Sequence, residues 1–289
     1  MDTGLVIMAV AFCLGVPLVT AGVALFSEKY QPALKPLRVK EDSPARAALI
    51  TFAVWAPLTA ILLYAVLTVD FYPTVASDKG EEIAHAFRVL TALAVPVFTM
   101  VVSVVLYSVL RRGTSASPDQ DGPPILGQGL FPNVWLGVTA GLTLLIIIYP
   151  GLTSLSKVMK TEENPDLVIQ VEGVQWTWLI GYPDYGISNQ RDLVIPVDRT
   201  VNFLITSRDV LHSFWIPSML MKTDAVPGRT TTISLRATKT GDFQSDPQVR
   251  LQCTELCGLG HSSMSIPVSV VSQREFDAWV QQKKASVRP

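Results

Sequence analysis

The sequence predicts a membrane protein with four transmembrane helices followed by an all-β sandwich domain. Of its 289 residues, 49% are hydrophobic and 16% are charged, and the mean hydropathy is +0.36, whereas soluble domains are about one quarter charged. Long apolar stretches occupy the first half of the chain, and short alternating stretches separated by turn residues occupy the second half. The formal net charge of −1 gives no support to nucleic-acid binding, which needs a basic surface.

Each apolar stretch in the first half is long enough to cross a membrane as a helix. A hydrocarbon core about 30 Å thick requires about 20 apolar residues in helical form, and no charge lies near the middle of any stretch. The first stretch follows Met-Asp-Thr instead of a basic segment, so we interpret it as a retained helix and not as a cleaved signal peptide. The four stretches are Gly4–Phe26, Ala47–Val69, Val89–Leu110 and Val134–Tyr149, the last of which is extended at its front by Leu130–Asn133.

The charges in the loops indicate the orientation of these helices. The loop after the first stretch is rich in Lys and Arg, and the loop after the third begins Arg111-Arg112. The positive-inside rule makes both loops cytoplasmic. We therefore expect a multi-pass protein of the cell (inner) membrane whose C-terminal domain faces the periplasmic or extracytoplasmic side. The predicted division is two helices in residues 1–70, a second helix pair in 71–153 and the outer domain in 154–289.

The outer domain is long enough to bury a core of its own. Its apolar stretches are short, and several alternate with polar residues, as half-buried strands do. Strands of this kind, separated by turns, predict a β-sandwich, and a short helix at about Gln273–Lys284 closes the chain. The expected strands are Leu167–Val171, Val174–Ile180, Leu193–Val197, Val201–Thr206, Thr230–Leu235, Val249–Cys253 and Ile266–Val271.

The outer domain also contains a cluster of metal-binding residue types. The chain has three Cys and three His, so a transition-metal site has few ligands to draw on. The segment from Cys253 to Met264 combines two thiols, the imidazole of His261 and a thioether. Sulfur ligands select copper, zinc or iron–sulfur centres, and a thioether favours copper. His212 is the other His of the outer domain, and it is the expected second imidazole ligand.

The second thiol changes the expected number of metal ions. Two thiolates four residues apart, Cys253 and Cys257, can bridge two coppers that are each capped by one His. Met264 and a backbone carbonyl such as that of Glu255 can complete the two sites. Such a filled site suits one-electron transfer, because it leaves no open position for a substrate. A structural zinc site is the alternative, but it would leave Met264 unexplained.

These residues carry a family resemblance. The pattern Cys-x-Glu-x-Cys-x-x-x-His-x-x-Met over Cys253–Met264 resembles the dinuclear copper (CuA) motif of cytochrome c oxidase subunit II. The segments Asp209–Pro217 and Lys222–Arg229 resemble the family's region around its first copper His. The segment Gln175–Trp178 resembles its electron-accepting aromatic segment. The resemblance extends from about Leu130 to Trp279.

The resemblance implies a cupredoxin-like sandwich and a role for each residue of the motifs. Glu255 would bind copper through its carbonyl, and its carboxylate would help to hold a Mg²⁺ or Mn²⁺ ion shared with subunit I, because hard cations prefer oxygen ligands. Trp176 would receive the electron from the donor. The side-chain copper ligands would be His212, Cys253, Cys257, His261 and Met264.

The function implied by the resemblance is that of the electron-accepting subunit of a respiratory cytochrome c oxidase. The chain would take electrons from cytochrome c or another donor protein and pass them to haem in subunit I, where O₂ reduction and proton pumping occur. It would have no oxidase activity alone, and its partners would be the other oxidase subunits and membrane lipid. Two alternatives keep the copper: a CuA subunit of a nitric oxide reductase, and a membrane-anchored copper carrier. A carrier would not need Trp176 or Glu255.

The chain also departs from the usual pattern of that family. Subunit II usually has two membrane helices, so the region Gly4–Val69 would supply two extra ones. Arg208 stands where an acidic residue is common, and basic and acidic residues nearly balance from Lys160 onward. Electrostatic steering of a basic cytochrome is therefore expected to be weak.

Overall fold

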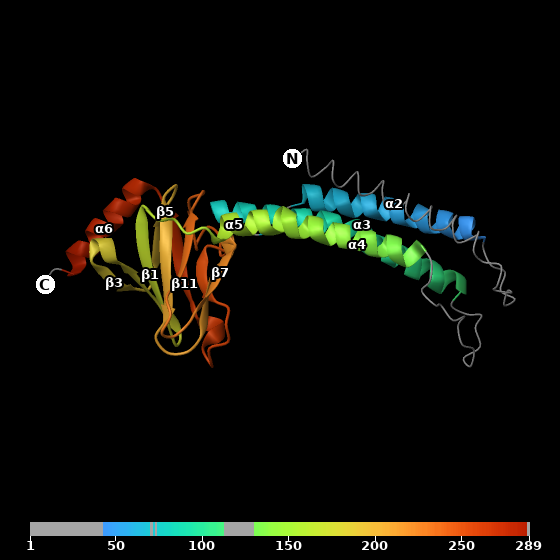
Figure 1. Ribbon diagram of the computed structural model, residues 1–289. Coiled ribbons are helices and arrows are strands. Elements are labelled where there is room, and N and C mark those ends of the chain that lie inside the picture. The colour runs from blue at the N-terminus through green and yellow to red at the C-terminus, as the bar shows by residue number, and fades with distance from the viewer. Residues whose placement is uncertain (1–42, 70–71, 73, 113–129, 288–289) are drawn as a thin grey trace. The chain divides into compact units, whose positions relative to one another are not determined.

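The computed structural model (Figure 1) describes residues 43–69, 72, 74–112 and 130–287. The described residues form two compact units. Among the described residues, one unit contains 43–69, 87–112 and 130–150, and the other contains 72, 74–86 and 151–287. We refer to them as the helical unit and the β unit.

Three helices in the described part of the chain are long and apolar enough to cross a membrane. They are built from α2 (Pro44–Thr68), α3 (Asp78–Arg112) and α4 (Leu130–Ile146). Helix α4 is followed by η1 (Ile147–Leu152), which contains a kink at Tyr149, and then by α5 (Thr153–Met159). The last three predicted spans are therefore found as helices. The first predicted span, Gly4–Phe26, lies outside the described residues.

Helix α2, which the family resemblance makes an extra helix, packs against α3 through buried polar contacts. The indole nitrogen of Trp55 donates to the carbonyl of Pro96 at 2.9 Å, and the hydroxyls of Thr59 and Thr99 lie 2.6 Å apart. In a membrane such polar contacts hold helices together, because there is no hydrophobic force between two apolar surfaces in lipid. Helix α2 is thus packed specifically against α3.

The first turn of α3 belongs to the β unit. The hydroxyl of Ser77 donates to the carbonyl of Met219 at 2.8 Å, and the carboxylate of Asp78 accepts the backbone N–H of Arg236 at 2.9 Å. Ser77 and Ala237 also form a β-bridge. Within the β unit, these contacts hold Ser77 and Asp78 against η3 and the end of β8.

The β unit is a sandwich of two sheets, which Figure 1 shows as stacked strands. The first sheet has the strand order β3-β2-β1-β5-β8. Strands β1 and β5 are parallel, and the other pairs in this sheet are antiparallel. Its strands are β1 (Leu167–Val174), β2 (Thr177–Tyr182), β3 (Ile187–Gln190), β5 (Thr200–Ser207) and β8 (Thr231–Arg236).

The second sheet has the strand order β4-β11-β10-β6-β7, and β9 pairs with β11. Three short 3-10 helices, η2 (Pro183–Tyr185), η3 (Pro217–Met219) and η4 (His261–Ser263), lie in the connections, and α6 (Gln273–Val287) follows the last strand. The strands are β4 (Leu193–Pro196), β6 (His212–Ile216), β7 (Met221–Ala225), β9 (Gly241–Asp242), β10 (Arg250–Cys253) and β11 (Ser265–Val271).

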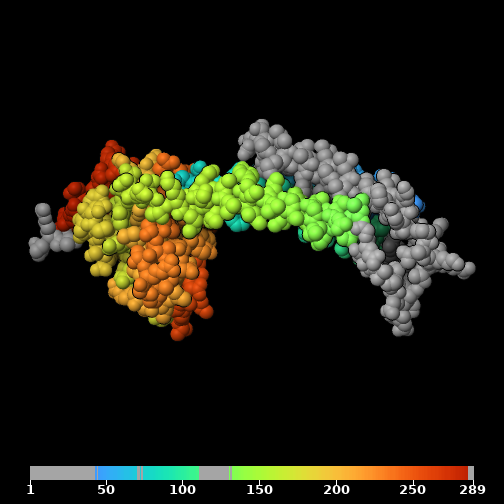
Figure 2. Space-filling view, viewed as in Figure 1, coloured from blue at the N-terminus to red at the C-terminus, as the bar shows by residue number. Residues whose placement is uncertain are grey.

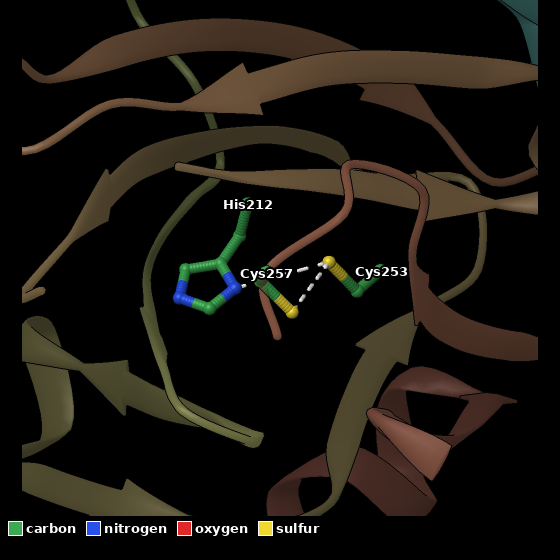
Figure 3. Close-up of side chains that lie close together, drawn as sticks. All are labelled: His212, Cys253 and Cys257. Atoms are coloured by element: carbon green, nitrogen blue, oxygen red, sulfur yellow. Dashed lines mark hydrogen bonds between the residues drawn. The ribbon is translucent and has the colours of Figure 1, made fainter. Parts of the chain in front are cut away.

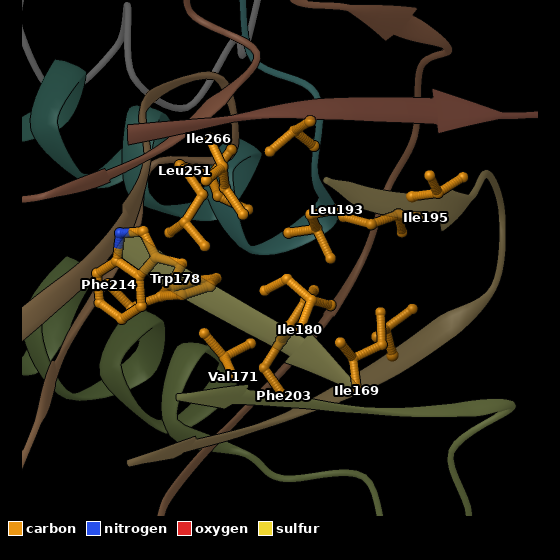
Figure 4. Packing of buried hydrophobic residues seen from close by; sticks show 14 of the residues in the cluster. Ile169, Val171, Trp178, Ile180, Leu193, Ile195, Phe203, Phe214, Leu251 and Ile266 are labelled. Atoms are coloured by element: carbon orange, nitrogen blue, oxygen red, sulfur yellow. The ribbon is translucent and has the colours of Figure 1, made fainter. Parts of the chain in front are cut away.

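The core lies between the two sheets (Figure 4). Side chains of the first sheet, such as Ile169 and Phe203, meet side chains of the second sheet, such as Leu251 and Ile195, and all four are buried. In β1 the buried residues occupy alternating positions, because successive side chains of a strand point to opposite faces. In the space-filling view, the part of the chain coloured orange forms a large share of the visible face of this unit (Figure 2).

The structure corrects the predicted strands in two ways. The expected strand Val174–Ile180 is wrong, because a turn at Gln175–Trp176 separates β1 from β2. Strands β3, β6, β7 and β9 were not expected. Strand β6 is buried along nearly its whole length, so it lacks the alternation of a half-buried strand.

Candidate metal centre

His212 is the first residue of β6, and its side chain is fully buried. Its Nδ1 atom lies 3.8 Å from the sulfur of Cys253, and its Nε2 atom lies 2.9 Å from a carboxylate oxygen of Asp209. Gly173 of β1 lies against the ring, since a Cβ atom there would be 2.7 Å from Cδ2 of His212. The imidazole is therefore fixed from two sides, with Nδ1 directed at the thiols.

The two thiols are positioned by the end of β10 and the loop that follows it. Cys253 ends β10 and pairs in register with Phe214 of β6, which brings it beside His212. The loop returns to β11, and the backbone N–H of Cys253 donates to the carbonyl of Met264 at 3.0 Å. The loop thus closes on itself and holds Cys257 between its two ends.

The donor atoms converge on one small volume (Figure 3). The donor atoms of His212, Cys253 and Cys257 all lie within 4.8 Å of one another. The two sulfurs are 3.9 Å apart. The sulfur of Cys257 lies 3.6 Å from Nδ1 of His261 and 3.7 Å from the sulfur of Met264. Two donor atoms bound to one metal at about 2.0 to 2.3 Å lie about 3 to 4 Å apart, so these residues fit a metal site.

Glu255 presents its backbone to the centre. Its carbonyl oxygen lies 3.3 Å from the sulfur of Cys253, whereas the residue as a whole is exposed. The structure therefore brings together all six groups that the sequence nominated as copper ligands, the five side chains and this carbonyl. Two thiols, a thioether and two imidazoles form a soft donor set, which suits copper.

The pKa values of two groups at the centre, the Cys257 thiol and the Asp209 carboxyl, are shifted in opposite directions. Burial and the neighbouring Cys253 raise the pKa of the Cys257 thiol to about 11, so a metal must displace the proton of this thiol in order to bind it. Burial opposes the ionisation of Asp209, but hydrogen bonds from Gln175, His212 and Val210 outweigh it, and the pKa of Asp209 is lowered. Asp209 therefore stays ionised and orients the ring of His212.

The two neighbouring tryptophans have different environments. Trp178 is fully buried and packs edge-on against the ring of His212, with centroids 5.9 Å apart. Trp176 is 41% exposed, and its indole nitrogen donates to the carbonyl of Cys257 at 3.2 Å. Trp176 is thus partly exposed and bonded through its indole N–H to a ligand residue, whereas Trp178 is part of the core.

Three residues near the centre were missed as functional candidates by the sequence reasoning. Gly173 and Asp209 hold His212, and Gln175 donates its side-chain amide to the carbonyl of Cys257 at 2.7 Å. The sequence contains one relevant signal, an Asp three residues before the nominated His. Nothing local indicates the roles of Gly173 and Gln175, because both depend on contacts between distant segments.

Comparison with known proteins gives the family of the chain. Residues 186–271 match the family model described as cytochrome C oxidase subunit II, periplasmic domain. The probable cytochrome c oxidase subunit 2 of Rickettsia bellii is 39% identical over 229 residues, which cover 72% of this chain and 81% of that protein. The corresponding protein of Rickettsia prowazekii is 33% identical over 233 residues, covering 73% of this chain and 71% of that protein. The chain belongs to the cytochrome c oxidase subunit II family.

Membership of the subunit II family makes the chain a subunit of a membrane-bound oxidoreductase, as the resemblance implied. Its apolar helices and a domain of the periplasmic subunit II type describe a membrane-anchored protein with an extracytoplasmic domain. Among solved structures, the periplasmic domain of subunit II (CoxB) of Bradyrhizobium japonicum is 32% identical, with a TM-score of 0.39. The similarity covers 44% of this chain and 100% of the Bradyrhizobium japonicum chain.

Proposed function

We propose that this chain is the electron-accepting subunit of a respiratory cytochrome c oxidase and that its donor groups hold a dinuclear copper (CuA) centre. The observation that carries the proposal is the pairing of the donors. His212 lies beside the sulfur of Cys253, while His261 and Met264 lie beside that of Cys257. The sulfurs face each other at 3.9 Å. This pairing supports two metal ions bridged by both thiolates, each capped by one imidazole.

Each residue of the centre has a defined task in this proposal. Asp209 holds the Nε2 side of His212, so that Nδ1 is left for the metal. Met264 and the carbonyl of Glu255 would complete the set of copper ligands, and the exposed Glu255 carboxylate would contribute to a Mg²⁺ or Mn²⁺ site with subunit I. Copper held there would accept one electron at a time from a cytochrome c-type donor and release it to haem in subunit I, where O₂ is reduced and protons are pumped.

Trp176 is the proposed residue for electron uptake. Its exposed edge is accessible to a donor protein, and its indole N–H reaches a backbone carbonyl of a ligand residue. The partners in the proposal are the haem-bearing subunit I, other oxidase subunits, the donor and membrane lipid. The proposed location is the cell (inner) membrane, with the copper domain on the periplasmic side.

The proposed organisation has three parts. Residues 1–70 provide two extra transmembrane helices, 71–153 the helix pair typical of subunit II, and 154–289 the cupredoxin-like domain. Helix α2 is the second of the two extra helices. Its packing on α3 through Trp55 and Thr59 supports the proposal that it is part of the membrane anchor.

The test is a metal and spectroscopic analysis of the intact complex. We expect it to contain two more copper atoms than the same complex in which Cys253 and Cys257 are both replaced by Ser. Those two coppers should share one unpaired electron in the EPR spectrum. One additional copper, or zinc in its place, would contradict the dinuclear centre. Consumption of O₂ with a reduced cytochrome c would support the oxidase role, and reduction of nitric oxide without O₂ consumption would favour the alternative reductase.

A further inference from the structure

The turn between β1 and β2 contacts both halves of the metal centre. The backbone N–H of Gln175 donates to Asp209 at 2.7 Å, and Asp209 holds His212. The side-chain amide of Gln175 donates to the carbonyl of Cys257 at 2.7 Å. One residue therefore links the strand-borne His212 to the loop that bears the second thiol.

The carbonyl of Cys257 accepts two N–H groups from this turn. One is the amide of Gln175 at 2.7 Å, and the other is the indole N–H of Trp176 at 3.2 Å. Because a carbonyl oxygen has two lone pairs, both bonds can form at once. The shorter bond, from Gln175, holds the Cys257 carbonyl oxygen in the position where it accepts the indole N–H of Trp176.

Two glycines of the loop between β10 and β11 lie against the turn that carries Gln175 and Trp176. A Cβ atom on Gly260 would lie 2.5 Å from Cγ and Cδ2 of Trp176, and one on Gly258 would lie 3.2 Å from the side-chain nitrogen of Gln175. Gly258 also has a φ of +116°, which side-chain-bearing residues rarely adopt. The loop therefore lies directly against the ring at Gly260.

We infer that Gln175 is a positioning residue for electron uptake, which holds the indole of Trp176 against the Cys257 carbonyl without being a metal ligand itself. This inference rests on the proposed function. Its physical basis is that the path from the indole to the Cys257 sulfur runs through one hydrogen bond and then covalent bonds. If the amide of Gln175 is lost, the carbonyl and the half-exposed ring are free to separate, and the path is broken.

The step that Gln175 assists involves one electron and no change of covalent bonds. The electron would leave the ferrous haem of a cytochrome c-type donor, which would become ferric, and bound copper would be reduced by one electron. The indole of Trp176 keeps its proton, because its N–H remains the donor to the Cys257 carbonyl. Gln175 acts on the geometry of this transfer and not on its driving force.

The first experiment measures electron uptake by the intact oxidase complex after mixing with a reduced cytochrome c. We expect Gln175→Leu to slow uptake by about tenfold, the size typical of losing a contact just outside a metal's ligands. The KM for the cytochrome and the EPR spectrum of the copper should not change. Gln170→Leu, on an exposed position of β1, is the matched control and should behave as the wild type.

A double-variant comparison separates this role from a general structural one. If Gln175 acts through Trp176, then Gln175→Leu should cause no further slowing when it is added to Trp176→Phe. Independent, multiplicative effects of the two changes would overturn the inference, as would normal uptake by Gln175→Leu. Normal uptake by Trp176→Phe would instead remove Trp176 from the proposed function, and the role of Gln175 with it.

A second readout needs no copper. The chain has six Trp, so the metal-free full chain labelled with ¹⁵N-Trp in detergent should give six indole N–H signals, and Trp176→Phe identifies one of them. Gln175→Leu should move that signal toward the position of an indole without a protein partner, while Gln170→Leu leaves it in place. An unmoved signal in Gln175→Leu would mean that Gln175 does not position the ring.

Discussion

The two halves of the metal centre are built by different means. His212 lies on a strand, is fully buried and is held by Asp209 and Gly173. The thiols, Met264 and His261 are carried by the end of β10 and one returning loop, in which His261 is only partly buried. The strand half is enclosed by a sheet and its core. In the loop half Cys253, Cys257 and Met264 are buried in the same core, whereas His261 is partly exposed.

This difference shows how one site can combine rigid geometry with access. A centre that exchanges electrons gains from ligands that do not move, which the buried strand supplies. It also needs an edge that partners can reach, and the loop supplies that edge through the half-exposed Trp176 and the exposed Glu255. Substitutions in the two halves should therefore impair the centre in different ways.

The largest effect is expected from the loop. Cys257→Ser should remove one bridging sulfur, so the complex should lose the EPR signal of two coppers sharing an electron, and electron uptake should fall to background. Ser262→Ala, an exposed change in the same loop, is the control and should keep the signal. An unchanged spectrum in Cys257→Ser would mean that the bridge is assigned to the wrong residue.

On the strand side, Gly173→Ala should disturb His212 and the folding of the β unit together. A methyl group there meets Cδ2 of His212 at 2.7 Å and the ring of Trp178 at 3.2 Å. Overpacking of this kind costs about 1 to 3 kcal/mol, measured as the free energy of unfolding of the metal-free chain. Gly241→Ala, which meets nothing within 4 Å, is the control. Equal stability of the two variants would contradict the tight packing around His212.

Asp209→Asn should weaken metal binding while preserving the fold. The variant keeps the shape of the side chain but loses the charge that orients the ring, and such changes typically reduce metal affinity by about 10- to 100-fold. Competition with a copper chelator measures the affinity. Asp184→Asn, at an exposed position in η2, is the control. Wild-type affinity in Asp209→Asn would show that the sheet alone orients His212.

The same residue gives a prediction for acid stability. The pKa of Asp209 is lower in the folded chain than its ordinary value of 3.8. Its contribution to stability is therefore fully present above that ordinary value and is lost as the pH falls through the lower, folded-state value. Denaturant titrations of the metal-free wild type and Asp209→Asn should converge as the pH is lowered through this range. A constant difference at all pH values would contradict the assigned shift.

The smallest effect is expected at the surface beside the strand half. Arg208 pairs with Glu172, and both side chains are partly exposed. Arg208→Ala should leave unfolding unchanged, because exposed ion pairs contribute little. The freed carboxylate should lower the KM for a basic cytochrome at low salt. Arg199→Ala, which breaks the exposed pair with Asp166, is the control. Equal changes in KM in the two variants would show that the location of the removed positive charge has no influence on binding of the cytochrome.

Much of the architecture could be predicted from local sequence. The three apolar helices that the structure describes follow from the lengths of their apolar stretches, and the sandwich follows from short alternating strands. The ligand types were evident because two Cys, a His and a Met fall in one short segment. The error at Val174–Ile180 has a physical cause: the turn at Gln175–Trp176 interrupts an apolar stretch without a Gly or Pro to mark it.

The sequence by itself determined the membrane anchor and the soft donor set, since hydrophobic length and ligand chemistry are properties of the residues themselves. Only the tertiary structure decided how the donors meet. His212 and Cys253 are 41 residues apart in the chain, and they become neighbours because β6 and β10 pair in a particular register. It also decided that Trp176 is half-exposed while Trp178 is buried, because strand pairing across distant segments determines which side chains face the core.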